Sequence, residues 1–230
     1  MVSQTGMIDF HSHTILSDGV LLPSEQMRRA TVMGYRALAI TDHADASNLA
    51  FLIDSLWRLL REQPDDFGAE LLVGVELTHV APGSIDRLAR RAKALGAEVV
   101  VVHGESPVEP VAPGTNRAAV ESAAVDVLAH PGFLTLAEAR IAAGRGCYIE
   151  ITTRKGHSLT NGHVARICLA TGAPMLVNTD THEPGDMVTL DFAQRVAAGA
   201  GLSKEQVRTA TETNPLELLS KVLQARGHQP

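Results

Sequence analysis

The chain has 230 residues, a formal net charge of −6 and 45% hydrophobic residues, the composition of an ordinary globular protein. The acidic balance argues against a nucleic-acid binder, because phosphate contacts call for basic side chains. No apolar run is long enough to span a membrane, and the N-terminal segment lacks the basic and apolar regions of a signal peptide. Cys147 and Cys168 stand outside any Cys-x-x-Cys motif, so we expect buried free thiols in a cytoplasmic protein.

Seven short apolar runs, each bounded by turn signals, predict strands buried on both faces. In chain order they are Met7–His13, Ala37–His43, Leu71–Leu77, Glu98–His103, Val125–His130, Cys147–Thr152 and Pro174–Asp180. Helix-like stretches lie between them, at Ser24–Gly34, Ser47–Gln63, Ser84–Gly96, Leu136–Gly144 and Gly162–Gly172. The Pro-rich segment Gly104–Arg117 is predicted to be a long loop, and long loops are often functional.

Strand and helix alternate along the chain, which predicts parallel strands joined by right-handed crossovers. Seven such units without a break in composition indicate an α/β barrel of seven strands, with TIM-like architecture, in a single domain over residues 1–230. An open, doubly wound sheet is the alternative. Extra helices are expected at about 187–226, with Ser203 and Asn214-Pro215 as starting points.

Metal-ligating residue types recur where the predicted strands end. They are His11, His13, His43, Glu76, His103, His130, Asp180 and His182. The carboxyl ends of barrel strands meet at one mouth, where active sites form. A single buried histidine is usually a hydrogen-bonded core residue, and Asp18 in Ser17-Asp18-Gly19 would suit a plain turn. Recurrence at five separate strand ends favours a metal site instead, since imidazole suits Zn, Mn and Fe and carboxylates can bridge two ions.

These residues fall in motifs that resemble the polymerase-and-histidinol-phosphatase (PHP) family. The segment Ile8-Asp9-Phe10-His11-Ser12-His13-Thr14 with Ser17-Asp18-Gly19, then Ile40-Thr41-Asp42-His43, Gly74-Val75-Glu76, His103, Ala129-His130-Pro131 and Asn178-Thr179-Asp180-Thr181-His182, follow in the family's order. The resemblance covers nearly the whole chain. It implies a distorted seven-stranded β/α barrel and a site for two to three divalent ions, Zn, Mn or Fe.

The resemblance also implies how the ligands divide. The first ion would be held by His11, His13, Glu76 and Asp180, the second by Glu76, His103 and His130, and the third by Asp18, His43 and His182. Some relatives carry histidine where Asp18 stands, so the third ligand set departs from theirs.

Signals for the substrate come from three basic residues. Arg154 and Lys155 follow the sixth predicted strand, which supplies no metal ligand but ends at the same mouth. Arg forms bidentate bonds with phosphate and Lys adds a point charge, so we expect both to bind phosphate, with Arg117 as a further candidate. Exposed loop charges are the alternative. His79, His157 and His163 are expected to do structural work.

The function expected is hydrolysis of a small phosphomonoester, similar to histidinol phosphate phosphatases. A hydroxide bridging two ions would attack phosphorus in line, and the third ion or a protonated His182 would stabilise the leaving alkoxide. Glu76, Asp180 and His182 are therefore the catalytic candidates.

Two alternatives stay open. Asn116-Arg117-Ala118-Ala119 and Val125–Gly132 also resemble the barrel protein subunit of ribonuclease P, an RNA-binding scaffold. The same metals could also hydrolyse amides or other esters. Neither the substrate nor the oligomeric state follows from the sequence.

Overall fold

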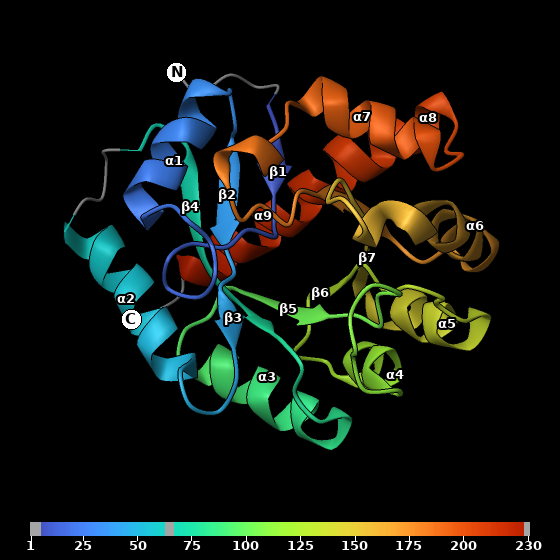
Figure 1. Cartoon of the computed structure of the whole chain (residues 1–230), viewed down its shortest axis with the longest axis horizontal. Helices are drawn as coiled ribbons and strands as arrows, with labels where there is room; N and C mark the ends of the chain where they lie inside the picture. The colour runs from blue at the N-terminus through green and yellow to red at the C-terminus, as the bar shows by residue number, and fades with distance from the viewer. Residues whose placement is uncertain (1–5, 63–66, 228–230) are drawn as a thin grey trace.

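The structure is a computed structural model that describes residues 6–62 and 67–227. In this part of the chain, parallel strands follow one another in the order β1-β2-β4-β5-β6-β7-β8 and helices surround them (Figure 1). The strands are β1 (Ile8–Asp9), β2 (Ala37–Ile40), β3 (His43–Ala44), β4 (Glu70–Leu77), β5 (Val99–His103), β6 (Val127–Ala129), β7 (Tyr148–Thr152) and β8 (Met175–Asn178). Each of the seven predicted runs therefore contains a strand.

The second predicted run is broken into β2 and β3, which pair with successive parts of β4. The break includes Asp42, whose carboxylate accepts hydrogen bonds from the Thr14 N–H (2.7 Å) and the Ser17 hydroxyl (2.7 Å). Asp42 thus fixes the loop after β1. His43, the next residue, lies in register with Glu76 of β4.

The barrel closes between β8 and β1, beyond the regular ends of both strands. The His13 N–H donates to the Thr181 carbonyl (2.7 Å), and the Asp180 N–H donates to the His11 carbonyl (2.9 Å). The predicted single-domain barrel of seven parallel strands is confirmed, with a distorted seam. The alternative of an open, doubly wound sheet is wrong, because these bonds join its two outer strands.

The helices that follow the strands lie outside the barrel, as Figure 1 shows. They are α1 (Pro23–Val32), α2 (Leu49–Glu62), α3 (Ile85–Ala94), α4 (Thr115–Glu121), α5 (Leu136–Arg145), α6 (Asn161–Thr171), α7 (Leu190–Gly199), α8 (Lys204–Arg208) and α9 (Asn214–Arg226). The predicted loop Gly104–Arg117 ends early, because α4 begins directly after Gly114, whose φ is 91°. The predicted end of the second helix, Gln63, lies outside the described residues.

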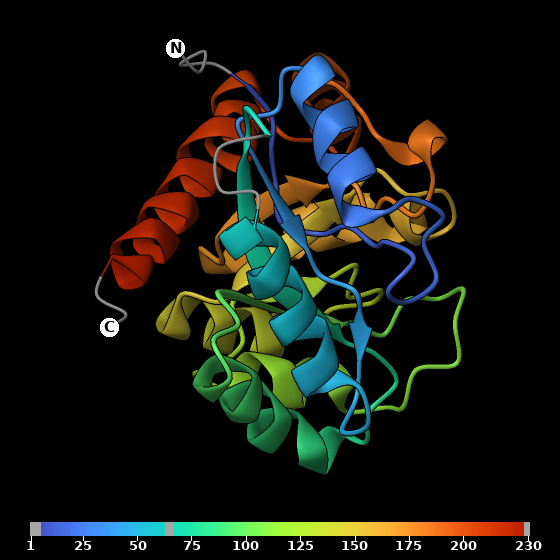
Figure 2. The same cartoon turned by 90° about the vertical axis from the view of Figure 1, so that its left-hand side faces the viewer.

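The helix α9 covers the end of the barrel where the strands begin. Its side chains Leu218, Leu219 and Val222 belong to the same buried hydrophobic cluster as the residues that fill the barrel interior, among them Phe10 and Val101. In Figure 2, α9 lies on one side of the barrel, and the loops that follow β1 and β5 lie on the other. The mouth formed by the strand ends is therefore the open end.

Two expectations from composition can be compared with the structure. Cys147 and Cys168 are buried free thiols, and burial raises the pKa of each to about 12, which keeps them protonated. Among residues 6–62 and 67–227, no helix combines the length and apolar character needed to cross a membrane.

The contact of α9 with the strand starts can be tested through Arg226. Its guanidinium binds the buried carboxylate of Glu98 through two bonds (2.5 and 2.7 Å) and also binds Glu70. Arg226→Ala should lower the free energy of unfolding by roughly 2–4 kcal/mol, because the Glu98 carboxylate loses its charged partner. Arg58→Ala removes an exposed i,i+4 pair and should cost less than about 1 kcal/mol.

Urea unfolding followed by circular dichroism measures both variants. Equal losses would show that the Arg226 contact does not hold α9 on the barrel.

Candidate metal centre

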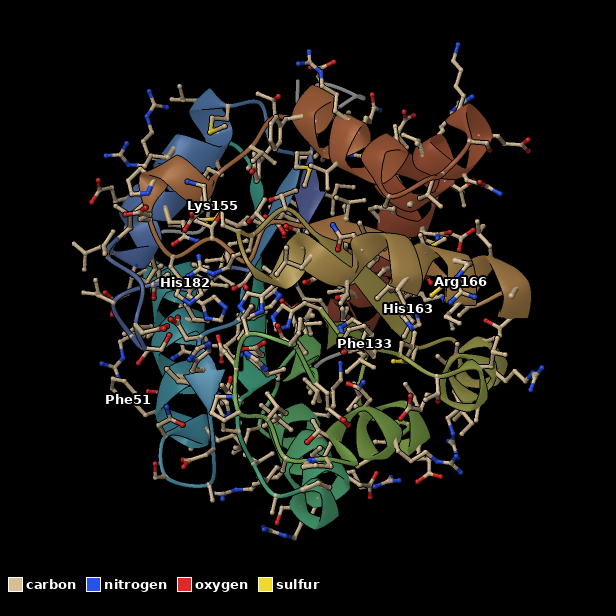
Figure 3. All side chains as sticks on the ribbon, turned by 45° about the vertical axis from the view of Figure 1, so that its right-hand side comes forward. Phe51, Phe133, Lys155, His163, Arg166 and His182 are labelled. Carbon is tan, nitrogen blue, oxygen red and sulfur yellow. The ribbon has the colours of Figure 1, made fainter. Side chains whose placement is uncertain are left out.

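Histidine and carboxylate side chains from the ends of several strands meet at the open mouth of the barrel. Figure 3 shows His182 within this crowd of ring nitrogens, whereas His163 on α6 lies apart with Phe133 and Arg166. The structure brings together all nine predicted ligands: His11, His13, Asp18, His43, Glu76, His103, His130, Asp180 and His182.

Two buried carboxylates, those of Glu76 and Asp180, lie at the centre of this group of side chains. Glu76 Oε1 is 3.2 Å from His11 Nε2, and Glu76 Oε2 is 3.0 Å from His43 Nε2. Asp180 Oδ1 is 3.2 Å from His13 Nε2, and Asp180 Oδ2 is 3.5 Å from His130 Nε2. Burial opposes ionisation of both carboxylates, but the neighbouring histidines outweigh it and hold both pKa values below the usual range.

The potential ligand atoms fall into sets whose members lie within 4.8 Å of one another. One set is His11, His13 and Asp180, another is His11, Glu76 and His130, and a third is His13, Asp18, His43 and His182. They overlap through His11 and His13, as expected when neighbouring cations share a compact site. Glu76 contacts members of more than one set, consistent with the predicted bridging position.

The ring orientations leave lone pairs facing the centre. In three histidines Nδ1 lies against a group that can only accept, so Nδ1 carries the proton: His11 against the Glu150 carboxylate (2.8 Å), His103 against the Gly104 carbonyl (3.1 Å) and His182 against the Asp180 carbonyl (3.0 Å). The Nε2 lone pair of each ring then faces a carboxylate oxygen at 3.1–3.2 Å. Only a second proton or a cation makes such a contact attractive.

Several polar atoms in the cluster are buried without a hydrogen-bond partner. They are Nε2 of His11, both ring nitrogens of His13 and His130, and Oε1 of Glu76. An unsatisfied buried polar atom costs about 1–3 kcal/mol, and native proteins contain few of them. Burial lowers the pKa of His13 to about 4 and the pKa of His130 well below its usual value, so both rings are neutral, the form that binds metal. The donor set therefore fits divalent Zn, Mn or Fe.

The backbone is in an uncommon conformation at two of these residues. His130 has a φ of 25° and Asp180 a φ of 53°, positive values that residues other than glycine rarely adopt. Both follow buried strands and turn their side chains into the mouth. Such conformations persist only where the surrounding structure enforces them, and they concentrate at functional sites.

A buried residue that the sequence analysis missed supports this arrangement. Glu150 of β7 accepts the Nδ1 proton of His11 and a bond from the Asn178 side-chain amide (2.9 Å) through the same oxygen. Histidines that bind metals almost always donate the second ring N–H to such an acceptor. Glu150 lies within a strand rather than at its end, so the strand-end pattern gave no sign of it.

The three predicted phosphate-binding residues are placed differently. Arg154 reaches the cluster, with Nε 3.5 Å from Asp180 Oδ2 and Nη1 2.9 Å from Asp186 Oδ2. Lys155 is exposed, next to Arg154 in sequence (Figure 3). Arg117 is directed away: it lies on α4, pairs with Glu121 (2.5 Å) and lines a hollow formed with α3 residues.

Three further residues lie against the cluster. His157 is buried, and its ring stacks on His130 with centroids 4.2 Å apart. Glu109, in the Pro-rich loop, contacts His79, His103 and His157 at 3.1–3.3 Å. His79 and His157 were expected to do structural work. Their place depends on loop conformation, which the strand pattern does not reveal, although the loop had been singled out by its length.

Comparison with known proteins gives relatives that match almost the entire chain. Uncharacterized protein MJ1295 of Methanocaldococcus jannaschii is 47% identical over 216 residues, which is 93% of this chain and 99% of that protein. A probable phosphatase of Syntrophotalea carbinolica is 24% identical, with 92% of this chain and 95% of that protein covered. Ribonuclease P protein component 3 of Methanosarcina mazei is 28% identical, with 93% and 88% covered. No family model matches the chain.

The chain belongs to the same family as MJ1295, and its motifs resemble those of the PHP family. Its barrel also matches the crystal structure of histidinol phosphate phosphatase from Lactococcus lactis, complexed with zinc, L-histidinol and phosphate. The TM-score is 0.59 at 15% sequence identity, with 86% of this chain and 94% of that chain covered. The chain therefore shares the barrel fold of that enzyme, and its nine motif residues converge at the mouth of the barrel.

The supporting role of Glu150 yields a test. Glu150→Gln should lower the affinity for divalent metal about 10- to 100-fold, because His11 loses the charged acceptor that fixes its ring. Glu138→Gln alters an exposed carboxylate of the α5 cap and should leave metal affinity unchanged. Competition with a coloured chelator measures both affinities. A wild-type affinity in Glu150→Gln would contradict the role assigned to this carboxylate.

Proposed function

We propose that this protein is a metal-dependent phosphoesterase that hydrolyses a small phosphomonoester at a trinuclear metal site. The observation that carries the proposal is the convergence of nine histidine and carboxylate donors at one barrel mouth, with buried ring nitrogens that have no other partner. Arg154 adds a cationic side chain beside the same donors. The relatives named as phosphatases and the shared barrel of histidinol phosphate phosphatase agree with this chemistry.

The ligands would divide among three ions as the family motifs imply. His11, His13, Glu76 and Asp180 would hold one, Glu76, His103 and His130 another, and Asp18, His43 and His182 the third. Bound ions would acidify a water molecule and neutralise phosphate oxygens. Asp18 is about half exposed, unlike the buried donors, so the third position is the most open to solvent.

The protein's own residues would bind and orient the substrate. Arg154 presents its guanidinium beside Asp180 and is held there by Asp186, so it is already directed before a phosphate arrives. Lys155, exposed beside it, would add charge at the rim. His182 keeps its proton on Nδ1 through the Asp180 carbonyl, which leaves Nε2 as the lone pair of a ligand. In this state His182 acts as a ligand rather than as the proton donor to the leaving group.

One relative supports a second candidate, an RNA-binding scaffold. The chain is 28% identical to a ribonuclease P protein component over 93% of its length. Its net charge of −6 opposes RNA binding, and a scaffold has no need of unsatisfied buried imidazoles. Amide or carboxyl-ester hydrolysis by the same metals is the third candidate.

A substrate screen separates the three. The metal-reconstituted protein would be offered sugar, amino-alcohol and nucleotide monophosphates, amide and carboxyl-ester substrates, and a labelled structured RNA. We expect hydrolysis of at least one phosphomonoester, abolished by a chelator and restored by metal. Turnover of amides or carboxyl esters alone, or RNA binding without any turnover, would overturn the proposal.

Removal of the Arg154 side chain tests the phosphate contact. Arg154→Ala should weaken phosphate binding by roughly 1.5–3 kcal/mol, about one to two decades in affinity, because a charge-assisted hydrogen bond is lost. The inhibition constant of inorganic phosphate measures the effect, and metal content should stay unchanged. Arg117→Ala is the matched control, since Arg117 pairs with Glu121 on α4. Wild-type phosphate inhibition in Arg154→Ala would refute the assignment.

The bridging position of Glu76 gives a graded prediction. Glu76→Gln should lose more phosphatase activity than His182→Asn, because Glu76 contacts histidines from several ligand sets whereas His182 serves one. His163→Asn, a histidine bound to the Leu134 carbonyl, should retain full activity. Rates measured with metal content determined in parallel decide the order. Equal rates at full metal occupancy would show that Glu76 does not bridge.

A further inference from the structure

A second group of potential ligands extends the cluster toward the loop after β5. The ligand atoms of His103, His130 and His157 lie within 4.8 Å of one another, and so do those of His79, His103 and Glu109. Metal–nitrogen bonds of about 2.0–2.2 Å can bridge such a spread after small side-chain adjustments. His157, Glu109 and His79 are not among the nine donors considered so far.

His157 is oriented as a ligand would be. Its side chain is only 6% exposed, and Nδ1 lies 2.6 Å from the Ser106 hydroxyl, which can accept the ring proton. Nε2 then faces inward, 3.3 Å from Glu109 Oε1 and 3.9 Å from Asp180 Oδ2. The neighbouring His130 ring, stacked on His157, has both nitrogens buried and without hydrogen-bond partners.

Glu109 faces two rings through one oxygen. Its Oε2 is 3.1 Å from His103 Nε2 and 3.1 Å from His79 Nε2. The His103 ring carries its proton on Nδ1, toward the Gly104 carbonyl, so its Nε2 lone pair faces the carboxylate. A cation shared by the two groups would take the place of the second ring proton that a close contact between this nitrogen and the carboxylate otherwise requires.

The loop that carries Glu109 is held in place by its own hydrogen bonds. Glu105 Oε1 accepts the N–H groups of Gly114 (3.0 Å) and Asn116 (2.9 Å), and the Asn116 side-chain oxygen accepts the Glu105 N–H (2.9 Å). The two ends of the loop are thus tied together at the start of α4. Ser106 and Glu109, from the same turn, contact the two nitrogens of His157.

We propose that His157 and Glu109 are additional ligands of the divalent ion held by His103 and His130. The inference rests on the metal centre of the proposed function and extends it. It gives this ion two further protein ligands, Glu109 from the loop after β5 and His157 from the segment after β7, in addition to those from the strand ends. Glu109 is 36% exposed and His157 is buried, so Glu109 is the ligand that an incoming phosphate oxygen would displace.

Metal retention, measured without any activity assay, tests this assignment. Wild-type protein and the variants His157→Asn and Glu109→Gln would be dialysed against graded chelator, and the ions per chain determined by elemental analysis. We expect each variant to release one ion per chain at a free-metal concentration at least about 10-fold higher than the wild type does, since even the loss of a supporting partner costs 10- to 100-fold. The other ions should remain bound.

Matched controls are His163→Asn, whose ring binds the Leu134 carbonyl, and Glu121→Gln, whose carboxylate pairs with Arg117. Both should follow the wild-type curve. With cobalt substituted for the native metal, the visible spectrum of the weakened position should change in His157→Asn and Glu109→Gln alone. Glu109 is partly exposed, so its conversion to Gln leaves a folded protein to measure even if His157→Asn does not fold.

The outcomes separate this inference from the proposed function. Wild-type metal curves and cobalt spectra in both variants would overturn the inference and leave the nine-donor site intact. A wild-type protein that holds no metal would overturn both. If the wild type holds metal but hydrolyses no phosphoester, the proposed function fails, whereas one weakened ion in the variants would still support the two extra ligands.

Discussion

The crowding of buried histidine rings and carboxylates at the barrel mouth is the constraint on which the rest of the structure depends. Ring nitrogens of His11, His43 and His130 lie 3.0–3.5 Å from carboxylate oxygens, and several of these atoms have no hydrogen-bond partner. Without protons or cations between them, such an arrangement is destabilising. The fold must therefore hold these groups together at a cost, which a bound cation offsets.

The elements around the mouth hold these groups in place. Parallel strands on both sides fix the strand ends, and α9 fills the opposite end of the barrel with aliphatic side chains. The Asp42 carboxylate anchors the loop after β1, and Glu150 accepts the Nδ1 proton of His11 and so fixes its ring. The positive φ angles of His130 and Asp180 are further local departures from regular backbone structure. Each one serves the placement of a donor rather than the regularity of the sheet.

The sequence predicted those features that depend on the spacing of apolar residues and on residue types at the ends of strands and helices. Each apolar run marked a strand, and the donors at the strand ends, together with Asp18 from the family motif, gave nine residues that the structure brings into one cluster. Ser203 and Asn214-Pro215 marked the starts of α8 and α9, because caps and Pro have defined positions in a helix. Strand-end reasoning works because parallel strands share a direction, so equivalent positions meet in space.

The sequence did not predict those features that depend on contacts between residues far apart in the chain. The break between β2 and β3 depends on bonds from Asp42 to a distant loop, and Glu150 is one strand residue among apolar neighbours. His157 and Glu109 reach the cluster through loops whose path no periodicity encodes. Arg117 was predicted at the mouth because its loop was expected to extend three residues further, yet α4 turns it toward Glu121.

The most direct test of the metal centre is a crystal structure of the protein as purified, with anomalous difference maps collected on both sides of the absorption edges of zinc, iron and manganese. We predict three peaks, with Glu76 between two of them and Asp18, His43 and His182 around the third. A map without anomalous peaks at the barrel mouth, with the histidines paired to carboxylates through protons alone, would contradict the account.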